Sequence, residues 1–210
     1  MKKLIRGILD FRKTRRPEYA ETFARLALGQ RPDSLFVACS DSRVVPNLFA
    51  STEPGDLFVL RNVGNIISPC GADGFSVSDE SEAAALEFAI DTLKVQDLIV
   101  CGHSECGALA ALLQGGTGGS HPHLDAWLRH AAPALAALRG GRRLPGPSTE
   151  LNQLTQLNVL TQLENLRSYA VVRDAEKAGR LRLHGWWFDI AQADVLLWDA
   201  AKGRFDVLAE

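Results

Sequence analysis

Short, uninterrupted apolar runs alternate with helical segments along most of this chain, and this alternation limits the fold more than any other feature. The runs SLFVAC (34–39), DLFVLRN (56–62) and DLIVCG (97–102) have the length of strands, and helices are predicted over 79–94 and about 105–114. Strands that are apolar throughout, rather than at every second residue, are typical of parallel sheets covered by helices on both faces. The order of the elements therefore predicts an α/β fold with a mostly parallel sheet.

The rest of the chain adds a fourth strand and further helices. A strand is expected over 181–190, and only a brief turn separates it from the apolar run at 193–200, which predicts an antiparallel C-terminal strand. Further helices are expected over 2–15, 18–29, 123–138 and 148–168, with a short one after 168. The prediction is a single domain over 1–210, with four strands in a mostly parallel central sheet, the antiparallel strand, flanking helices and an N-terminal helical arm over 1–30.

Charge is unevenly distributed, although the net charge is only −2. Residues 1–16 carry seven Lys or Arg side chains and one acid, which is typical either of contact with nucleic acid or of an amphipathic helix with solvated charges. The apolar stripe of Leu4, Ile5, Ile8 and Leu9 favours the helix, and no second basic cluster follows it. No nucleic acid partner is therefore predicted.

The sequence also predicts where the protein resides. No segment reaches the ~18 apolar residues that cross a bilayer, and Arg6 and Asp10 interrupt any signal-peptide core, so we expect a cytoplasmic protein with no membrane partner. Four cysteines in 210 residues are too few for a disulfide scaffold, and a reducing compartment favours metal binding or catalysis.

Cysteine and histidine side chains stand at the ends of two predicted strands. Cys39 ends the first strand, and His103 and Cys106 follow the third, three residues apart. The carboxyl ends of parallel strands share one edge of the sheet, where ligand sites lie, so the three side chains are expected to converge. Two thiolates and an imidazole suit tetrahedral Zn²⁺ and leave its fourth position open. A redox pair and plain core packing remain alternatives, and core packing is the interpretation given to Cys70 and Cys101.

Asp41 and Arg43 lie within four residues of Cys39 and therefore close to any metal bound there. A carboxylate in that place can bind the metal or accept a proton from a water on it, and an arginine beside the carboxylate lowers its pKa and can hold it off the metal. The alternative is a surface ion pair worth under about 1 kcal/mol. The position at a strand end favours the functional interpretation.

Four motifs in the same order resemble the β-class carbonic anhydrases: CSDSR followed by V-x-P, EPGDLFVLRNVGN (53–65), CGHSECG (101–107) and HGWWFD (184–189). The resemblance extends from about residue 20 to residue 200. It implies reversible hydration of CO₂ to bicarbonate by a zinc-bound hydroxide, with one Zn²⁺ per chain held by Cys39, His103 and Cys106. It also implies that Arg43 holds Asp41 away from zinc and that Asp41 orients the hydroxide.

The same resemblance implies substrate contacts and an assembly. Gln30 matches a residue that hydrogen-bonds substrate, Phe58, Val63 and Phe88 match the lining of a small apolar CO₂ pocket, and the backbone N–H of Gly107 would stabilise the developing oxyanion. Members of the family assemble as homodimers or homotetramers, with N-terminal helices reaching across a partner. No proton shuttle is identified, and His121 and His123 are candidates only by their place in a predicted loop.

One departure from the family concerns regulation. A subgroup binds an inhibitory bicarbonate with a tryptophan, a glycine and a tyrosine, where this chain has Phe36, Ala38 and Phe188. Because the indole N–H and the hydroxyl are missing, no bicarbonate allostery of that kind is predicted. Two other functions stay open: hydrolysis of COS or CS₂ on the same zinc ligands, and a catalytically silent zinc or bicarbonate-binding regulator, which intact Asp41 and Arg43 disfavour.

Overall fold

A six-stranded mixed sheet forms the centre of the protein in a computed structural model that describes residues 1–146 and 149–208. The strand order is β2-β1-β3-β4-β5-β6. The strands are β1 (Ser34–Cys39), β2 (Leu57–Asn62), β3 (Asp97–His103), β4 (Arg182–Asp189), β5 (Asp194–Asp199) and β6 (Arg204–Val207). The first four are parallel and the last two antiparallel, which confirms the predicted sheet and adds β6, a strand that the sequence analysis did not predict.

The register brings the carboxyl ends of the central strands together. Cys39 pairs with Asn62 across β1 and β2, Ala38 pairs with Cys101 across β1 and β3, and His103 reaches the end of β3. Residues 35–39 and 98–103 are all buried, as expected for central strands covered on both faces. Cys39 and His103 therefore end neighbouring strands at the same edge of the sheet.

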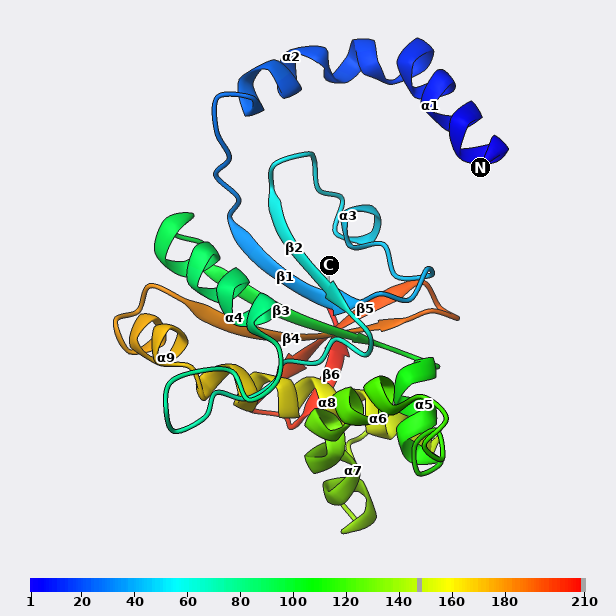
Figure 1. Cartoon of the computed structure of the whole chain (residues 1–210), viewed down its shortest axis with the longest axis vertical. Helices are drawn as coiled ribbons and strands as arrows, with labels where there is room; N and C mark the ends of the chain where they lie inside the picture. Colours follow the sequence, from blue (N-terminus) through cyan, green and yellow to red (C-terminus); the bar gives the residue numbers. More distant parts are fainter. Residues whose placement is uncertain (147–148, 209–210) are drawn as a thin grey trace.

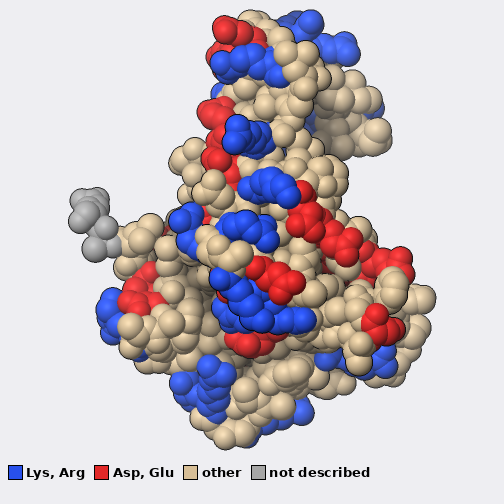
Figure 2. Space-filling model, turned by 90° about the vertical axis from the view of Figure 1, so that its left-hand side faces the viewer, with Lys and Arg blue, Asp and Glu red and all other residues tan. Residues whose placement is uncertain are grey.

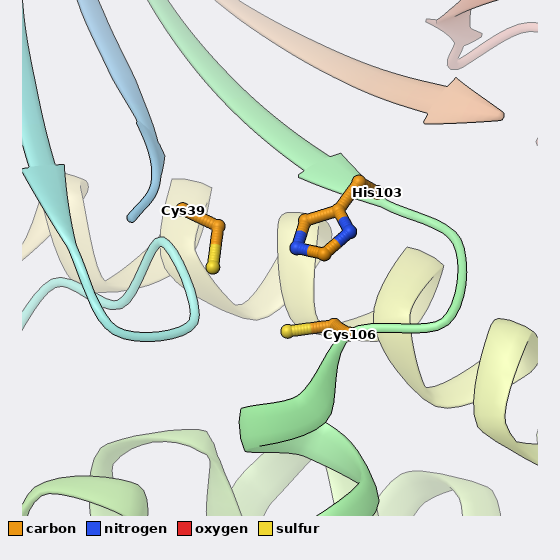
Figure 3. Close-up of side chains that lie close together, drawn as sticks. All are labelled: Cys39, His103 and Cys106. Carbon is orange, nitrogen blue, oxygen red and sulfur yellow. The ribbon is translucent and has the colours of Figure 1, made fainter. Parts of the chain in front are cut away.

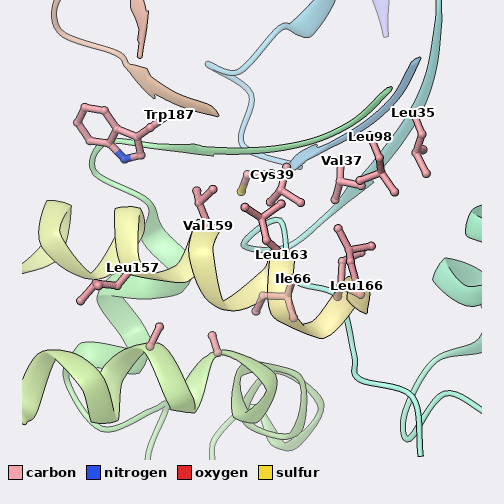
Figure 4. Close-up of a cluster of buried hydrophobic side chains, with 14 of the residues drawn as sticks. Leu35, Val37, Cys39, Ile66, Leu98, Leu157, Val159, Leu163, Leu166 and Trp187 are labelled. Carbon is pink, nitrogen blue, oxygen red and sulfur yellow. The ribbon is translucent and has the colours of Figure 1, made fainter. Parts of the chain in front are cut away.

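The helices of the structure are α1 (Lys2–Thr14), α2 (Arg16–Leu26), α3 (Pro46–Phe49), α4 (Glu80–Glu87), α5 (Gly107–Leu113), α6 (Pro122–Leu128), α7 (Ala132–Arg139), α8 (Glu150–Arg167) and α9 (Ala170–Lys177). α8 crosses one face of the sheet, and α5, α6 and α7 gather beyond it (Figure 1). The side chains of Val159, Leu163 and Leu166 on α8 point towards strand residues such as Val37 and Leu98 (Figure 4). This main core holds α8 against the strands that carry Cys39 and His103.

Gly102 lets α8 approach β3 closely. A Cβ atom at this position would lie 2.6 Å from Cγ2 of Val159 and 3.3 Å from the carbonyl oxygen of Thr155. A larger residue would force the helix away from the strand, at a typical cost of about 1–3 kcal/mol for an overpacked core. The residue just before His103 therefore has to be small.

The opposite face of the sheet carries a smaller buried cluster. Side chains alternate between the two faces of a strand, so Phe36 and Ala38 point away from the face that carries Cys39 and pack with Cys101 and Phe188. Phe36 meets Trp186 edge to face, with ring centroids 5.6 Å apart, and α3 covers part of this cluster through Phe49.

Two predicted helices are interrupted in the structure. The helix expected over 79–94 begins at Glu80, capped by the Asp79 carboxylate, and becomes a π-helical turn over Phe88–Thr92. The helix expected over 123–138 is two helices, α6 and α7, separated by a 3₁₀ turn just before Pro133, because a proline cannot supply the N–H that a continuous helix needs there. The predicted start of α8 at 148 lies outside the described residues; the described helix begins at Glu150.

The N-terminal helices form an arm that leaves the rest of the chain (Figure 1). α1 and α2 contain no buried residue, and the stripe of Leu4, Ile5, Ile8 and Leu9 is at least half exposed. On the face shown in Figure 2, acidic and basic side chains are intermingled below the arm. Within the described ranges, no helix is both long and apolar enough to cross a membrane.

Candidate metal centre

Two thiols and one imidazole meet at the carboxyl edge of the sheet. Cys39 lies at the end of β1, His103 at the end of β3 and Cys106 at the start of α5, and their side chains point towards one another (Figure 3). One ligand atom from each residue lies within 4.8 Å of the other two, and all three residues are buried. The convergence predicted from the strand ends is therefore present.

The turn between β3 and α5 directs the side chains of His103 and Cys106 towards the same place. Glu105 adopts a left-handed backbone conformation, with φ of 55°, which reverses the chain between the two ligands. The side chain of Asn152 on α8 accepts a hydrogen bond from the backbone N–H of Glu105 at 2.9 Å and donates one to its carboxylate at 3.1 Å. α8 therefore holds this turn from outside the motif.

The sulfur of Cys39 lies among hydrogen-bond donors. The backbone N–H groups of Asp41 and Gly64 donate to it at 3.4 and 3.3 Å. The pKa of the Cys39 thiol is lowered, chiefly because the Cys106 thiol donates to its sulfur and further because of the neighbouring His103 ring and these two N–H groups, while burial acts in the opposite direction. The pKa of Cys106 is raised by the same contact and by burial. The N–H groups of Asp41 and Gly64 are therefore placed to stabilise a thiolate at Cys39.

His103 is fixed in the tautomer that suits a metal ligand. Its Nδ1 lies 2.9 Å from the carbonyl oxygen of Ser104, so the proton is on Nδ1 and the lone pair on Nε2. Nε2 is fully buried and forms no hydrogen bond with any described residue. A buried imidazole nitrogen without a partner costs free energy unless something binds it. This nitrogen and two neighbouring thiols fit a tetrahedral zinc ion with one position free.

Asp41 and Arg43 form a two-pronged ion pair beside this group. Nε of Arg43 donates to Oδ1 of Asp41 at 2.9 Å, and Nη2 donates to Oδ2 at 2.7 Å. Oδ2 also lies 4.0 Å from Nε2 of His103. The hydrogen bonds from Arg43 hold the pKa of the Asp41 carboxyl well below its usual range, so the group is ionised at neutral pH.

Arg61 on β2 stabilises the same loop, and the sequence analysis did not single it out. Its guanidinium donates to the carbonyl oxygens of Cys39, Asp41 and Val44, at distances of 2.8 to 3.1 Å. The sequence did contain a signal for this role: Arg61 lies in an otherwise apolar strand, where a charged side chain needs hydrogen-bond acceptors nearby. Arg61 therefore stabilises the backbone segment that contains Cys39 and Asp41.

The other predicted site residues divide into two groups. Val63 lies in the loop after β2, next to the Gly64 that donates to Cys39, and Gly107 is the first residue of α5, so both lie beside the metal group. The remaining three lie towards the amino end of the sheet, where Gln30 precedes β1, Phe58 pairs with Leu35 and Phe88 packs on Phe58 with ring centroids 5.8 Å apart. Within one chain, Phe58 and the Phe88 ring packed on it therefore lie towards the opposite end of the β1–β2 pair from Cys39, which pairs with Asn62.

The histidines named as proton-shuttle candidates also differ in position. His121 lies before α6 and its Nδ1 lies 2.9 Å from Oγ of Ser120. His123 is exposed and lines a pocket together with Ser40 and Val63, next to the metal group.

An open, mostly parallel sheet with a buried Cys₂His group at its carboxyl edge defines an α/β protein with a site for a zinc-like metal ion. A family model described as carbonic anhydrase matches residues 34–195 of the chain. The carbonic anhydrase of Pseudomonas aeruginosa is 41% identical over 210 residues, which covers 100% of this chain and 93% of that protein. Carbonic anhydrase 1 of Escherichia coli O157:H7 is 39% identical over 209 residues, with 100% and 93% covered.

Solved structures give the same result. The β-carbonic anhydrase CcaA superimposes with a TM-score of 0.90 at 36% identity and with 99% of both chains covered. A tetrameric β-carbonic anhydrase of Sordaria macrospora gives a TM-score of 0.80 at 28% identity over 95% of this chain and 96% of that one. The chain belongs to the β-carbonic anhydrases, a family of enzymes.

Proposed function

We propose that this protein catalyses the reversible hydration of CO₂ to bicarbonate and a proton, with one zinc ion per chain. The observation that carries the proposal is the position of Asp41, whose ionised carboxylate is held by Arg43 within 4.0 Å of Nε2 of a ligand histidine, His103. A metal site that served only structure or regulation would need neither charged residue. Membership of the carbonic anhydrase family supports the same reaction.

Cys39, His103 and Cys106 would hold the zinc ion. When bound, zinc lowers the pKa of a coordinated water from 15.7 to about 7, a value known for carbonic anhydrases of the three-histidine kind, and so supplies hydroxide near neutral pH. The N–H of Asp41 and the N–H of Gly64 stabilise the negative charge on Cys39, since both donate to its sulfur.

Asp41 is the hydrogen-bond acceptor for the attacking oxygen in this proposal. Because both carboxylate oxygens receive hydrogen bonds from Arg43, the carboxylate has a fixed orientation and stays ionised, and it is kept from moving onto the metal. The accepted hydrogen bond directs the lone pair of the oxygen towards the carbon of CO₂. Arg43 itself is placed by the carbonyl oxygen of Glu105, to which Nη2 donates at 3.0 Å.

Val63 and Gly107 are proposed to contact the substrate from the same chain. Val63 supplies an apolar wall, and the N–H of Gly107, the first residue of α5, is one of the helix-start donors suited to a developing oxyanion. Gln30, Phe58 and Phe88 remain proposed substrate contacts. Phe58 pairs with Leu35 near the start of β1, whereas Cys39 ends that strand, so we propose that the copies of these three residues in a second subunit reach the metal group.

A homodimer or homotetramer is proposed because a second subunit could supply these substrate contacts and because the arm exposes an apolar stripe. The exposed stripe of Leu4, Ile5, Ile8 and Leu9 on the arm would be buried by a second copy. The Sordaria macrospora relatives are described as tetrameric. A cytoplasmic location is also proposed, because all four cysteines are free thiols and two of them, Cys39 and Cys106, belong to the metal group.

The deciding experiment measures zinc content and CO₂ hydration together for wild type and Asp41→Ala. We expect about one zinc per chain in both proteins and a fall in turnover of at least about 100-fold in the variant, the size of effect seen when a preorganised catalytic hydrogen bond is removed. Asp10→Ala, a substitution of an exposed acid on the arm, is the matched control and should keep full activity. Zinc-loaded wild type without CO₂ hydration would overturn the proposal.

A further inference from the structure

A pocket next to the metal group contains a buried acid that the proposed reaction does not yet use. The pocket has a volume of about 420 Å³ and is lined by Ser40 and Val63 on the loops near Cys39, by Glu82 on α4 and by His123 on α6. Glu82 is 2% exposed, whereas His123 is exposed. The pocket therefore joins a buried carboxyl group to the protein surface.

Polar groups hold the Glu82 carboxyl group without neutralising it. Nδ2 of Asn62 donates to Oε1 at 3.1 Å, and Oγ of Ser68 donates to Oε2 at 3.5 Å. Ser68 is itself tied to Ser76, with the two hydroxyl oxygens 2.6 Å apart. None of these groups carries a charge, so Glu82 is buried among hydrogen-bond donors and receives no compensating cation from them.

The titratable groups around Glu82 come from three elements. Asp79, at the start of the same helix, lies near enough to repel a second negative charge. Tyr169, before α9, donates its hydroxyl proton to the carbonyl oxygen of Ser68 at 2.7 Å, and His123 faces the pocket from α6. Burial first and Asp79 second raise the pKa of Glu82 to about 7. The carboxyl group thus gains and loses its proton near neutral pH.

Asn62 links this acid to the metal group. Its Cα pairs with that of Cys39 across β1 and β2, and its carbonyl oxygen accepts from the N–H of Ser40 at 2.8 Å. Its side-chain amide donates to Glu82. Of the next two residues, Val63 lines the pocket, and the backbone N–H of Gly64 donates to the sulfur of Cys39. One short segment therefore forms both the wall of the metal group and the wall of the acid's pocket.

We propose that Glu82 is the proton acceptor that clears the site after each hydration of CO₂, passing the proton through its pocket to His123 or to buffer. The inference rests on the proposed function. Hydration of CO₂ gives bicarbonate and one proton; the Glu82 carboxylate takes that proton through water in the pocket and becomes a carboxylic acid, and it then gives the proton to a base in solution and returns to the carboxylate. No oxidant, reductant or further reactant is needed.

The test uses the full-length, zinc-loaded protein and the variants Glu82→Gln, Glu82→Asp and Glu80→Gln. Glutamine has the shape of glutamate and can still accept from Asn62, but it cannot carry the proton. Glu80 is an exposed acid on the same helix and is the matched control. For each protein, kcat and kcat/KM for CO₂ hydration are measured by stopped flow at low and at high imidazole concentration, and ¹⁸O exchange at equilibrium reports the interconversion of CO₂ and bicarbonate separately from proton release.

For Glu82→Gln we expect kcat at low buffer to fall at least tenfold, to recover at high imidazole, and to leave kcat/KM and the interconversion rate unchanged. Glu82→Asp, which keeps a carboxyl group, should retain more of kcat than the glutamine variant, and Glu80→Gln should match wild type. Unchanged kcat at low buffer would overturn the inference. So would an equal loss of kcat and kcat/KM without rescue by imidazole, because that pattern describes a structural residue. Wild type that hydrates no CO₂ at any buffer concentration would instead overturn the proposed function itself.

Discussion

Nη2 of Arg43 donates both to the carboxylate of Asp41, at 2.7 Å, and to the carbonyl oxygen of Glu105, at 3.0 Å. Asp41 follows β1, and Glu105 lies in the turn just before Cys106. A single guanidinium therefore connects the loops that carry two of the proposed zinc ligands, and it does so on the side where Asp41 faces His103. The position of the Asp41 carboxylate therefore depends on the planar guanidinium of Arg43, which can donate several hydrogen bonds at once.

Arg43→Lys tests that dependence. Lysine keeps the charge but cannot make two parallel bonds to a carboxylate and a third to a carbonyl. Loss of charge-assisted hydrogen bonds worth about 1.5–3 kcal/mol predicts a fall in kcat of roughly 10- to 100-fold with zinc content unchanged. Stopped-flow kinetics and metal analysis on the same preparation measure both quantities. Arg25→Lys on the exposed arm is the control, and equal kcat in the two variants would mean that the Asp41–Arg43 pair is only a surface ion pair.

The proposed zinc ligands are tested by comparing two cysteines. In Cys106→Ser a thiolate is replaced by a hydroxyl that binds zinc poorly, so we expect most of the zinc and of the activity to be lost. Cys70→Ser changes a half-buried thiol outside the metal group and should keep about one zinc per chain. Metal analysis after gel filtration checks both. Zinc retained in Cys106→Ser at the wild-type level would contradict the assignment.

Bicarbonate should act on this enzyme only as a product. The residues that replace the anion ligands, Phe36 and Phe188, are buried in an apolar cluster, where Phe188 stacks on Phe49 with centroids 4.8 Å apart. Arg61 already donates to three carbonyl oxygens in the same region. We therefore expect inhibition by bicarbonate without cooperativity and, near pH 8, an Asp41 that stays on Arg43. Sigmoidal inhibition would show that an anion enters this cluster.

The sheet and the metal group could be predicted because both depend on local sequence. Apolar strands that alternate with helices predict the parallel pairing, and the carboxyl ends of parallel strands share one edge of the sheet. Cys39 and His103 each lie at the end of one such strand, and a spacing of three residues at a helix start brings His103 and Cys106 together. β6 was not predicted, because RFDV (204–207) is short and has charged residues at every second position. β6 forms because it pairs with β5. That pairing cannot be read from the sequence of β6 alone.

The supporting residues around the site could not be predicted, because they act through contacts between distant segments. Asn152 reaches the turn at Glu105 across 47 residues, and Arg61 reaches the carbonyl oxygen of Cys39 across 22. The burial of Glu82 also results from contacts between segments that are distant in the sequence. Acids in the first turn of a helix usually face solvent and favour the helix dipole, and only the packing of α4 against the loop after β2 places this one inside.

Glu82 should destabilise the folded protein at alkaline pH. In the unfolded chain its pKa is 4.5, and in the folded protein it is raised to about 7. Between these values the unfolded state has lost its proton while the folded state still holds it, so stability falls as pH rises from about 4.5 to 7 and is constant above. A difference of this size corresponds to about 3 kcal/mol. Glu82→Gln removes the titration and should therefore be more stable than wild type at pH 8 by an amount of that order.

Urea unfolding of wild type, Glu82→Gln and Glu80→Gln at pH 5 and at pH 8 measures this contribution. The difference between wild type and Glu82→Gln should be small at pH 5, where the buried acid is protonated and resembles the amide, and should grow towards pH 8. The exposed Glu80 gives no such growth, because its charge stays in water in both states. A pH-independent difference for Glu82→Gln would mean that the carboxyl group is ionised throughout this range, and that result would remove the physical basis for a proton acceptor at this position.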